Sequence, residues 1–138
     1  MKFTQLITIA LLMGVALSCS AEANKNKEEK NTKELQQTEE VEVYYFHNTR
    51  RCATCKAVES VSKEAVQELE NKNVSFTALN IEKSEGKEKA KELGISGQTL
   101  LIAGGDEKFN VTQNGFLHAR SNPEKLKKII QEKIKSLQ

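Results

Sequence analysis

The chain has 138 residues, and its 21 basic and 19 acidic side chains leave a net charge of +2. This length allows one small domain, and the mixed charges without a basic block exclude the electrostatic footprint of a nucleic-acid-binding protein. Aromatic residues are few, Trp is absent and only one Pro occurs, so the chain is not a disulfide-stapled mini-protein.

The first 18 residues are typical of a signal peptide. Lys2 precedes an apolar run from Leu6 to Leu17, which is too short to span a membrane. The sequence Ala16-Leu17-Ser18-Cys19 resembles a bacterial lipobox, with Ala16 where Leu is usual, and therefore predicts acylation of Cys19. Ordinary secretion with cleavage nearby is the alternative. Acyl chains would anchor the exported protein to a membrane that faces the periplasm or the cell exterior.

Residues 19–40 are predicted to form a lipidated, disordered tether. From Ser20 to Glu40 the chain has one Leu and no aromatic residue, Val or Ile, so it cannot bury enough surface to fold. A flexible segment of this length reaches about 25 Å. A short exposed helix around Lys33 to Thr38 is the alternative, and residues 41–138 form the expected domain.

The domain begins with a strand at Val41–His47 that is apolar on both faces near its end, as a central strand requires. A helix from Ala53 to about Lys72 follows, with one stripe of apolar positions. Val74–Ile81 reads as a second strand. A strand, a helix and a second strand in succession form a βαβ unit, so the two strands should be parallel.

The rest of the domain alternates between polar helices and short apolar strands. The expected elements are a helix at Glu82–Leu93 stopped by Gly94, a hairpin of strands at Gly97–Gly104 and Glu107–Thr112, an irregular stretch at Gln113–Ser121, and a helix begun by Asn122 and Pro123. The order β-α-β-α-β-β-α predicts an α/β fold with a central mixed sheet of about four strands. It resembles the thioredoxin fold, and we expect a monomeric domain.

Cys52 and Cys55 lie where the first strand leads into the first helix. Unpaired N–H groups at a helix start favour a thiolate, so we expect Cys52 to attack and the more buried Cys55 to resolve the mixed disulfide. Arg50 and Arg51 add positive charge beside Cys52 and should lower the pKa of its thiol. A permanently closed, structural disulfide is the alternative.

The same thiols could instead hold a soft ion such as copper(I) or trivalent arsenic, which favour thiolate ligands. Two thiolates are few for a metal site, so His47, and less directly His118, are candidate further ligands. Haem attachment is not expected, because Lys56 rather than His follows Cys55. No other cofactor is predicted.

Two segments, Tyr44 to Cys55 and Ser96 to Leu101, resemble a small bacterial family of thioredoxin-like proteins. That family is found with arsenic-resistance genes and is catalogued as a nitrophenyl compound nitroreductase subunit. The resemblance implies that Cys52 and Cys55 are a redox pair, supplied with electrons by a membrane-bound donor or within a larger reductase complex. The implied acceptors are nitroaromatic or organoarsenical compounds.

The chain departs from general thioredoxins near the dithiol. Arg51 replaces the Trp before the first cysteine, and Gln98 stands where those proteins have a cis-proline, with Thr99 beside it. Gln98 and Thr99 are therefore the expected substrate-facing residues, and the loss of the proline disfavours general disulfide exchange with protein substrates. Three hypotheses follow: a membrane-tethered thiol–disulfide oxidoreductase, a binder of a soft metal or metalloid, and a docking subunit whose disulfide never cycles.

Overall fold

The computed structural model describes residues 40–138, so the predicted signal peptide, Cys19 and nearly all of the tether lie outside the described residues. The four strands are β1 (Val41–His47), β2 (Val74–Asn80), β3 (Thr99–Gly104) and β4 (Glu107–Asn110). They form one sheet in the order β2-β1-β3-β4, in which β1 is parallel to β2 and antiparallel to β3. The predicted βαβ unit and hairpin are confirmed.

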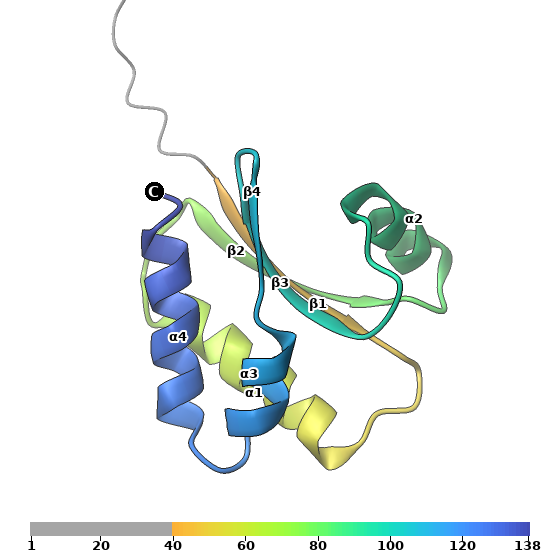
Figure 1. Cartoon of the computed structure of the whole chain (residues 1–138), viewed down its shortest axis with the longest axis horizontal. Helices are drawn as coiled ribbons and strands as arrows, with labels where there is room; N and C mark the ends of the chain where they lie inside the picture. The colour runs from red at the N-terminus through yellow and green to blue at the C-terminus, as the bar shows by residue number, and fades with distance from the viewer. Residues whose placement is uncertain (1–39) are drawn as a thin grey trace, which may run out of the picture. The chain divides into compact units, whose positions relative to one another are not determined.

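Helices cover both faces of this sheet (Figure 1). On one face lie α1 (Ala53–Gln67), α3 (Thr112–His118) and α4 (Pro123–Lys135), and on the other lies α2 (Ser84–Leu93). The element order and the mixed four-stranded sheet are those of a thioredoxin-like fold, as predicted. None of the helices within residues 40–138 is long and apolar enough to cross a membrane.

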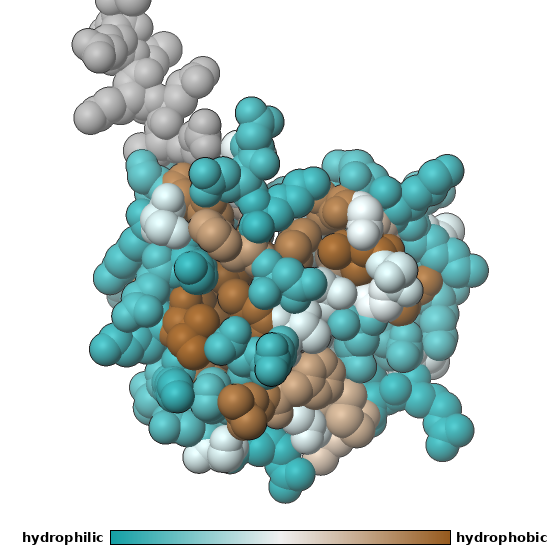
Figure 2. All heavy atoms as spheres, viewed as in Figure 1, coloured by the Kyte–Doolittle hydropathy of each residue, from teal (hydrophilic) through white to brown (hydrophobic). Residues whose placement is uncertain are grey.

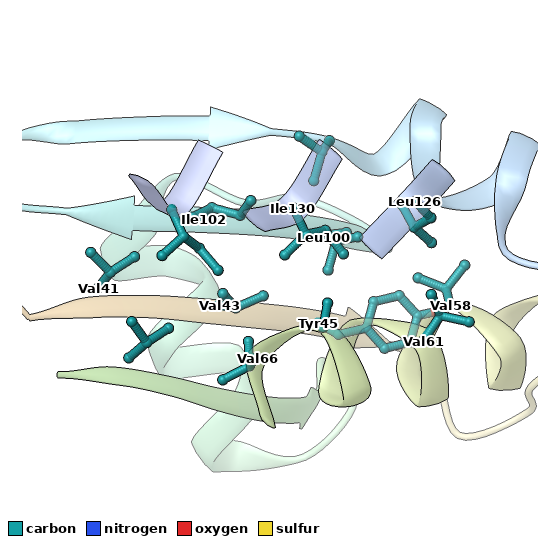
Figure 3. Packing of buried hydrophobic residues seen from close by; sticks show 14 of the residues in the cluster. Val41, Val43, Tyr45, Val58, Val61, Val66, Leu100, Ile102, Leu126 and Ile130 are labelled. Atoms are coloured by element: carbon teal, nitrogen blue, oxygen red, sulfur yellow. The ribbon is translucent and has the colours of Figure 1, made fainter. Parts of the chain in front are cut away.

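Each face of the sheet has its own hydrophobic core, because residues of β1 alternate between the two faces. Val41, Val43 and Tyr45 pack with α1, β3 and α4 in the larger core (Figure 3). Tyr44 and Phe46 face the smaller core under α2. The space-filling view agrees, because apolar atoms reach the surface beside α4 and beside α2, with polar side chains around them (Figure 2).

The predicted helix signals are confirmed at two ends. Gly94 ends α2 in the left-handed conformation, with φ 73°, which glycine adopts without strain. Asn122 caps α4, its side-chain oxygen accepting a hydrogen bond from the Lys125 N–H at 3.1 Å, and Pro123 opens the helix.

One segment was predicted wrongly. Residues within Gln113–Ser121 were expected to be irregular, but most of them belong to α3. Gly115 lies in the middle of this helix, where a Cβ atom would come within 3.3 Å of Val58 and 3.4 Å of Leu100. Glycine is a common signal for a turn, but here it lets the helix approach α1 and β3. Smaller differences are that α1 ends at Gln67 and β4 at Asn110, each earlier than expected.

Candidate functional site: a dithiol at the start of the first helix

The loop that leaves β1 delivers Cys52 to the N-cap of α1, just before its first turn. The backbone N–H of Cys55 donates a hydrogen bond to Cys52 Sγ at 3.2 Å. The two cysteines form a disulfide, with their Cα atoms 5.1 Å apart. The predicted position of the pair is therefore confirmed, and one orphan N–H of the helix start is already directed at the first sulfur.

The two cysteines differ in exposure. Cys52 is exposed, whereas Cys55, which lies in the first turn of α1, is only 5% exposed. The first turn of α1 has no acidic residue that would oppose a negative charge on Cys52. This arrangement suits an outer sulfur that meets a partner and an inner sulfur that closes the disulfide again.

The two arginines before Cys52 are placed differently from each other. Arg50 is exposed. Arg51 forms an ion pair with Glu59, which lies two turns along α1, and both side chains are about one quarter exposed. Because Glu59 offsets much of the Arg51 charge, the positive field of the two arginines at Cys52 is weaker than it would be if both were unpaired. Glu59 could not be predicted from the sequence, since a glutamate on the polar side of a helix carries no distinguishing signal.

Gln98 lies close to the buried end of Tyr45. Its side-chain Nε2 donates a hydrogen bond to the Tyr45 hydroxyl oxygen at 3.0 Å. Tyr45 is fully buried, and this burial raises its pKa, although the hydrogen bond from Gln98 and the charge of Arg51 act in the opposite direction. Residues 40–138 contain no cis peptide bond. Gln98, which was expected at the position of the cis-proline, therefore has a trans peptide and an amide side chain bonded to a tyrosine.

Thr99, the other predicted substrate-facing residue, is buried. It lies opposite Phe46 in the sheet, and its hydroxyl donates to the Gly97 carbonyl oxygen at 3.1 Å. Its side chain is thus engaged in the backbone of the segment that leads into β3. This contact holds Gln98, which lies between the two bonded residues.

The loop before Cys52 is fastened to the turn that follows β2. Glu82 Oε2 accepts a hydrogen bond from the Thr49 N–H at 3.2 Å, and Asn80 Nδ2 donates to Thr49 Oγ1 at 2.9 Å. Asn80 Oδ1 also accepts from the Glu82 N–H at 2.9 Å. The hydrogen bonds from Thr49 lower the pKa of Glu82, which keeps this carboxylate ionised. We refer to Thr49, Asn80 and Glu82 as the loop clamp.

The candidate histidine ligands are not gathered around the sulfurs. His47 Nδ1 lies 2.9 Å from the Asn48 carbonyl oxygen, and the ring borders a hollow of about 290 Å³ between β2 and the start of α2. His118 is the last residue of α3. Among residues 40–138 no group of three or more His, Cys, Asp or Glu side chains could hold a metal ion. A metal bound by Cys52 and Cys55 alone stays a prediction.

The chain has no match among known families or curated proteins and only a weak similarity to a solved structure. One solved structure, described as "Structure of a malarial protein", is similar over 57% of this chain and 91% of its own, with 18% identity and a TM-score of 0.38. That likeness is too weak to bear on fold or function.

Proposed function

We propose that the protein is a membrane-tethered thiol–disulfide oxidoreductase or electron-transfer subunit that uses Cys52 and Cys55. The observation that carries the proposal is the exposed Cys52 at the N-cap of α1, with its sulfur accepting the Cys55 N–H and with Cys55 buried behind it. A helix start that donates to a sulfur stabilises the thiolate form, which is the attacking species.

The reaction consists of two exchanges that balance. The Cys52 thiolate attacks a disulfide of the acceptor, forms a mixed disulfide and releases one acceptor thiolate. The Cys55 thiolate then attacks Cys52 Sγ, which releases the second acceptor thiolate and leaves the protein disulfide. Two electrons have passed to the acceptor. A membrane-bound dithiol donor returns them by the same exchange in reverse.

Single-cysteine variants test the assignment of roles. In the full chain, Cys55→Ser should trap a mixed disulfide with a small disulfide substrate, whereas Cys52→Ser should trap none and should lose disulfide-reducing activity. The trapped species is counted by mass spectrometry. Undiminished activity in Cys52→Ser would refute the proposal.

The reduction potential separates a cycling disulfide from a structural one. Equilibration with glutathione should give a reduction potential of about −200 mV, as for catalytic dithiols, whereas a potential below about −300 mV would indicate a structural disulfide. That second result would favour the docking subunit whose disulfide never cycles.

A second candidate function, binding of copper(I) or arsenite by the reduced pair, is favoured by the exposure of Cys52, which lets an ion reach the sulfurs from solvent. Titration of the reduced chain with each ion should then show one equivalent bound and lost on oxidation. An absence of stoichiometric binding would remove this candidate and leave the exchange reaction untouched.

A further inference from the structure

The two edges of the sheet are protected to very different degrees. β4 forms one edge, and it has four residues that include Glu107 and Lys108. β2 forms the other, and its seven residues, VSFTALN, include no charged residue, proline or glycine. Natural proteins usually blunt exposed edges with charges, prolines or short strands, because unpaired N–H and C=O groups recruit another strand. The β4 edge has these protections, and the β2 edge has none of them.

The backbone groups available on β2 follow from its pairing with β1. The Val41 N–H donates to the Asn73 carbonyl at 2.8 Å, and the Ile81 N–H donates to the His47 carbonyl at 2.9 Å, so odd-numbered residues of this segment direct their backbone toward β1. Backbone direction alternates along a strand, so the N–H and C=O groups of the even-numbered residues Phe76 and Ala78 point away from the sheet.

We propose that two copies of this chain pair along β2, antiparallel, about a two-fold axis at Thr77, so that their sheets become one. In this register Phe76 of one copy lies opposite Ala78 of the other, twice. Each such pair exchanges both backbone hydrogen bonds, as closely paired residues do in antiparallel sheets. This departs from the monomeric domain expected from the sequence.

The side chains fit a self-pairing in this register. Thr77 meets Thr77, Ser75 meets Leu79, and no charged residue within the strand faces another, so the pairing has no like-charge repulsion. Just outside the strand, the same register places Lys72 of each copy beside Glu82 of the other. Lys72 is exposed and has no ion-pair partner among residues 40–138, whereas the Glu82 carboxylate is ionised. The ends of the interface therefore carry opposite charges, which is why the second copy is the occupant that fits best.

Cysteine cross-linking tests the register. Thr77 would face its own copy as a pair without mutual hydrogen bonds, with Cα atoms about 4.5 Å apart, within the range that a disulfide bridges. Ser75 is a matched control, because it is half-buried on the same side of the same strand. The two Ser75 residues would lie about 14 Å apart at a rise of about 3.4 Å per residue, which is too far for a disulfide.

The measurement uses the full chain with Cys52→Ser and Cys55→Ser, produced in bacterial cells and oxidised in place. Thr77→Cys should form a disulfide-linked homodimer at least about tenfold faster than Ser75→Cys, as seen by non-reducing electrophoresis. Equal rates, or faster cross-linking of Ser75→Cys, would overturn the proposal.

A second measurement guards against variants that fail to fold. Native mass spectrometry of the full chain released from detergent should show dimers. A monomer would overturn the proposal, and is the result that occupation of the edge by residues 1–39 or by another protein would give. Thr77→Lys and Thr77→Glu should each be monomeric alone, because like charges would meet at the axis, and should form a mixed dimer when combined. Failure of the mixture to pair, with both variants folded by circular dichroism, would also count against it.

Discussion

Tyr45 and Gln98 form a polar contact at the position that corresponds in sequence to the cis-proline of thioredoxins. Tyr45 lies in the larger core with its ring beside α1 (Figure 3), and its hydroxyl reaches the side chain of Gln98. The tyrosine therefore fixes the direction of the amide at the predicted substrate-facing position. Gln98 is placed by a residue 53 positions earlier in the chain, which explains how it can be ordered without a proline.

Replacing the tyrosine should lower stability in a way that depends on pH. Tyr45→Phe leaves the Gln98 amide without its acceptor and should reduce the free energy of unfolding by about 1–2 kcal/mol at neutral pH. Because the folded-state pKa of Tyr45 is raised above 10.0, wild-type stability is full below pH 10 and falls as the pH rises above it. Urea unfolding at neutral and alkaline pH should show a smaller alkaline loss in the variant. Equal alkaline losses would contradict the raised pKa of Tyr45, and an unchanged stability at neutral pH would contradict the contact with Gln98.

The ion pair between Arg51 and Glu59 should moderate the acidity of the dithiol. Glu59→Gln releases the Arg51 charge, so the thiolate fraction of reduced Cys52 at neutral pH should rise by up to about fivefold, the equivalent of about 1 kcal/mol for a partly exposed pair. The rate of alkylation of Cys52 against pH measures this. Glu64→Gln is the control, since Glu64 bonds to Lys127 on α4 and not to the arginine. A rate unchanged in Glu59→Gln would show that Arg51 does not act on the sulfur.

At the scale of elements, α2 is held unusually close to the end of β2. A Cβ atom at Gly86, in the first turn of α2, would collide with the backbone carbonyl oxygen of Asn80. A Cβ atom added at Gly97 would have no other atom within 4 Å. Asn80 and Glu82 also bond to Thr49 in the loop before Cys52, so packing of α2 and placement of the dithiol are linked.

Gly86→Ala should therefore destabilise the fold by about 1–3 kcal/mol, as overpacking against backbone does. Gly97→Ala should change stability by no more than about 0.5 kcal/mol, since it has space and an ordinary backbone conformation. Denaturant unfolding of the two variants measures the difference. Similar values for both would mean that α2 can shift away from β2 without cost.

At the scale of the whole molecule, the sequence accounts for the element order because each element carries a local signal. The apolar β1, the stripe of α1, Gly94 and the Asn122–Pro123 start all act over a few residues, and each is confirmed. The failure at α3 has the opposite cause. Gly115 is a local signal for a turn, and only the tertiary position of Val58 and Leu100 shows that it permits close packing.

The candidate site likewise has features that could be predicted from the sequence and features that could not. The dithiol at a helix start was predictable, since strand, spacing and helix lie within one short stretch. The Tyr45–Gln98 contact, the Arg51–Glu59 pair and the loop clamp were not, because each depends on register or helix phase between residues that the sequence leaves unconnected. Gln98 was expected to face the site, but the residue that orients it could not be read from the sequence.

The predicted lipid anchor belongs to the whole chain and lies outside the described residues. If Cys19 is acylated, the full chain should incorporate labelled fatty acid and sediment with membranes, and Cys19→Ser should do neither. Cys52→Ser provides the control for loss of a cysteine elsewhere. Soluble, unlabelled wild-type protein after processing would support ordinary secretion instead.

The loop clamp has a consequence for the speed at which the dithiol changes state. Thr49 is bonded on both its backbone and its side chain to the turn after β2, only three residues before Cys52. We therefore expect the disulfide to open by rotation of a side chain without rearrangement of the loop, so that little of the structure reorganises when electrons are transferred. Amide hydrogen exchange at Thr49 and Glu82 should be equally slow in the oxidised and reduced protein. Asn80→Ala should accelerate this exchange in both states. Equal exchange in the oxidised and reduced protein would mean that the dithiol accepts and releases electrons on a rigid loop, whereas faster exchange in the reduced protein would contradict this.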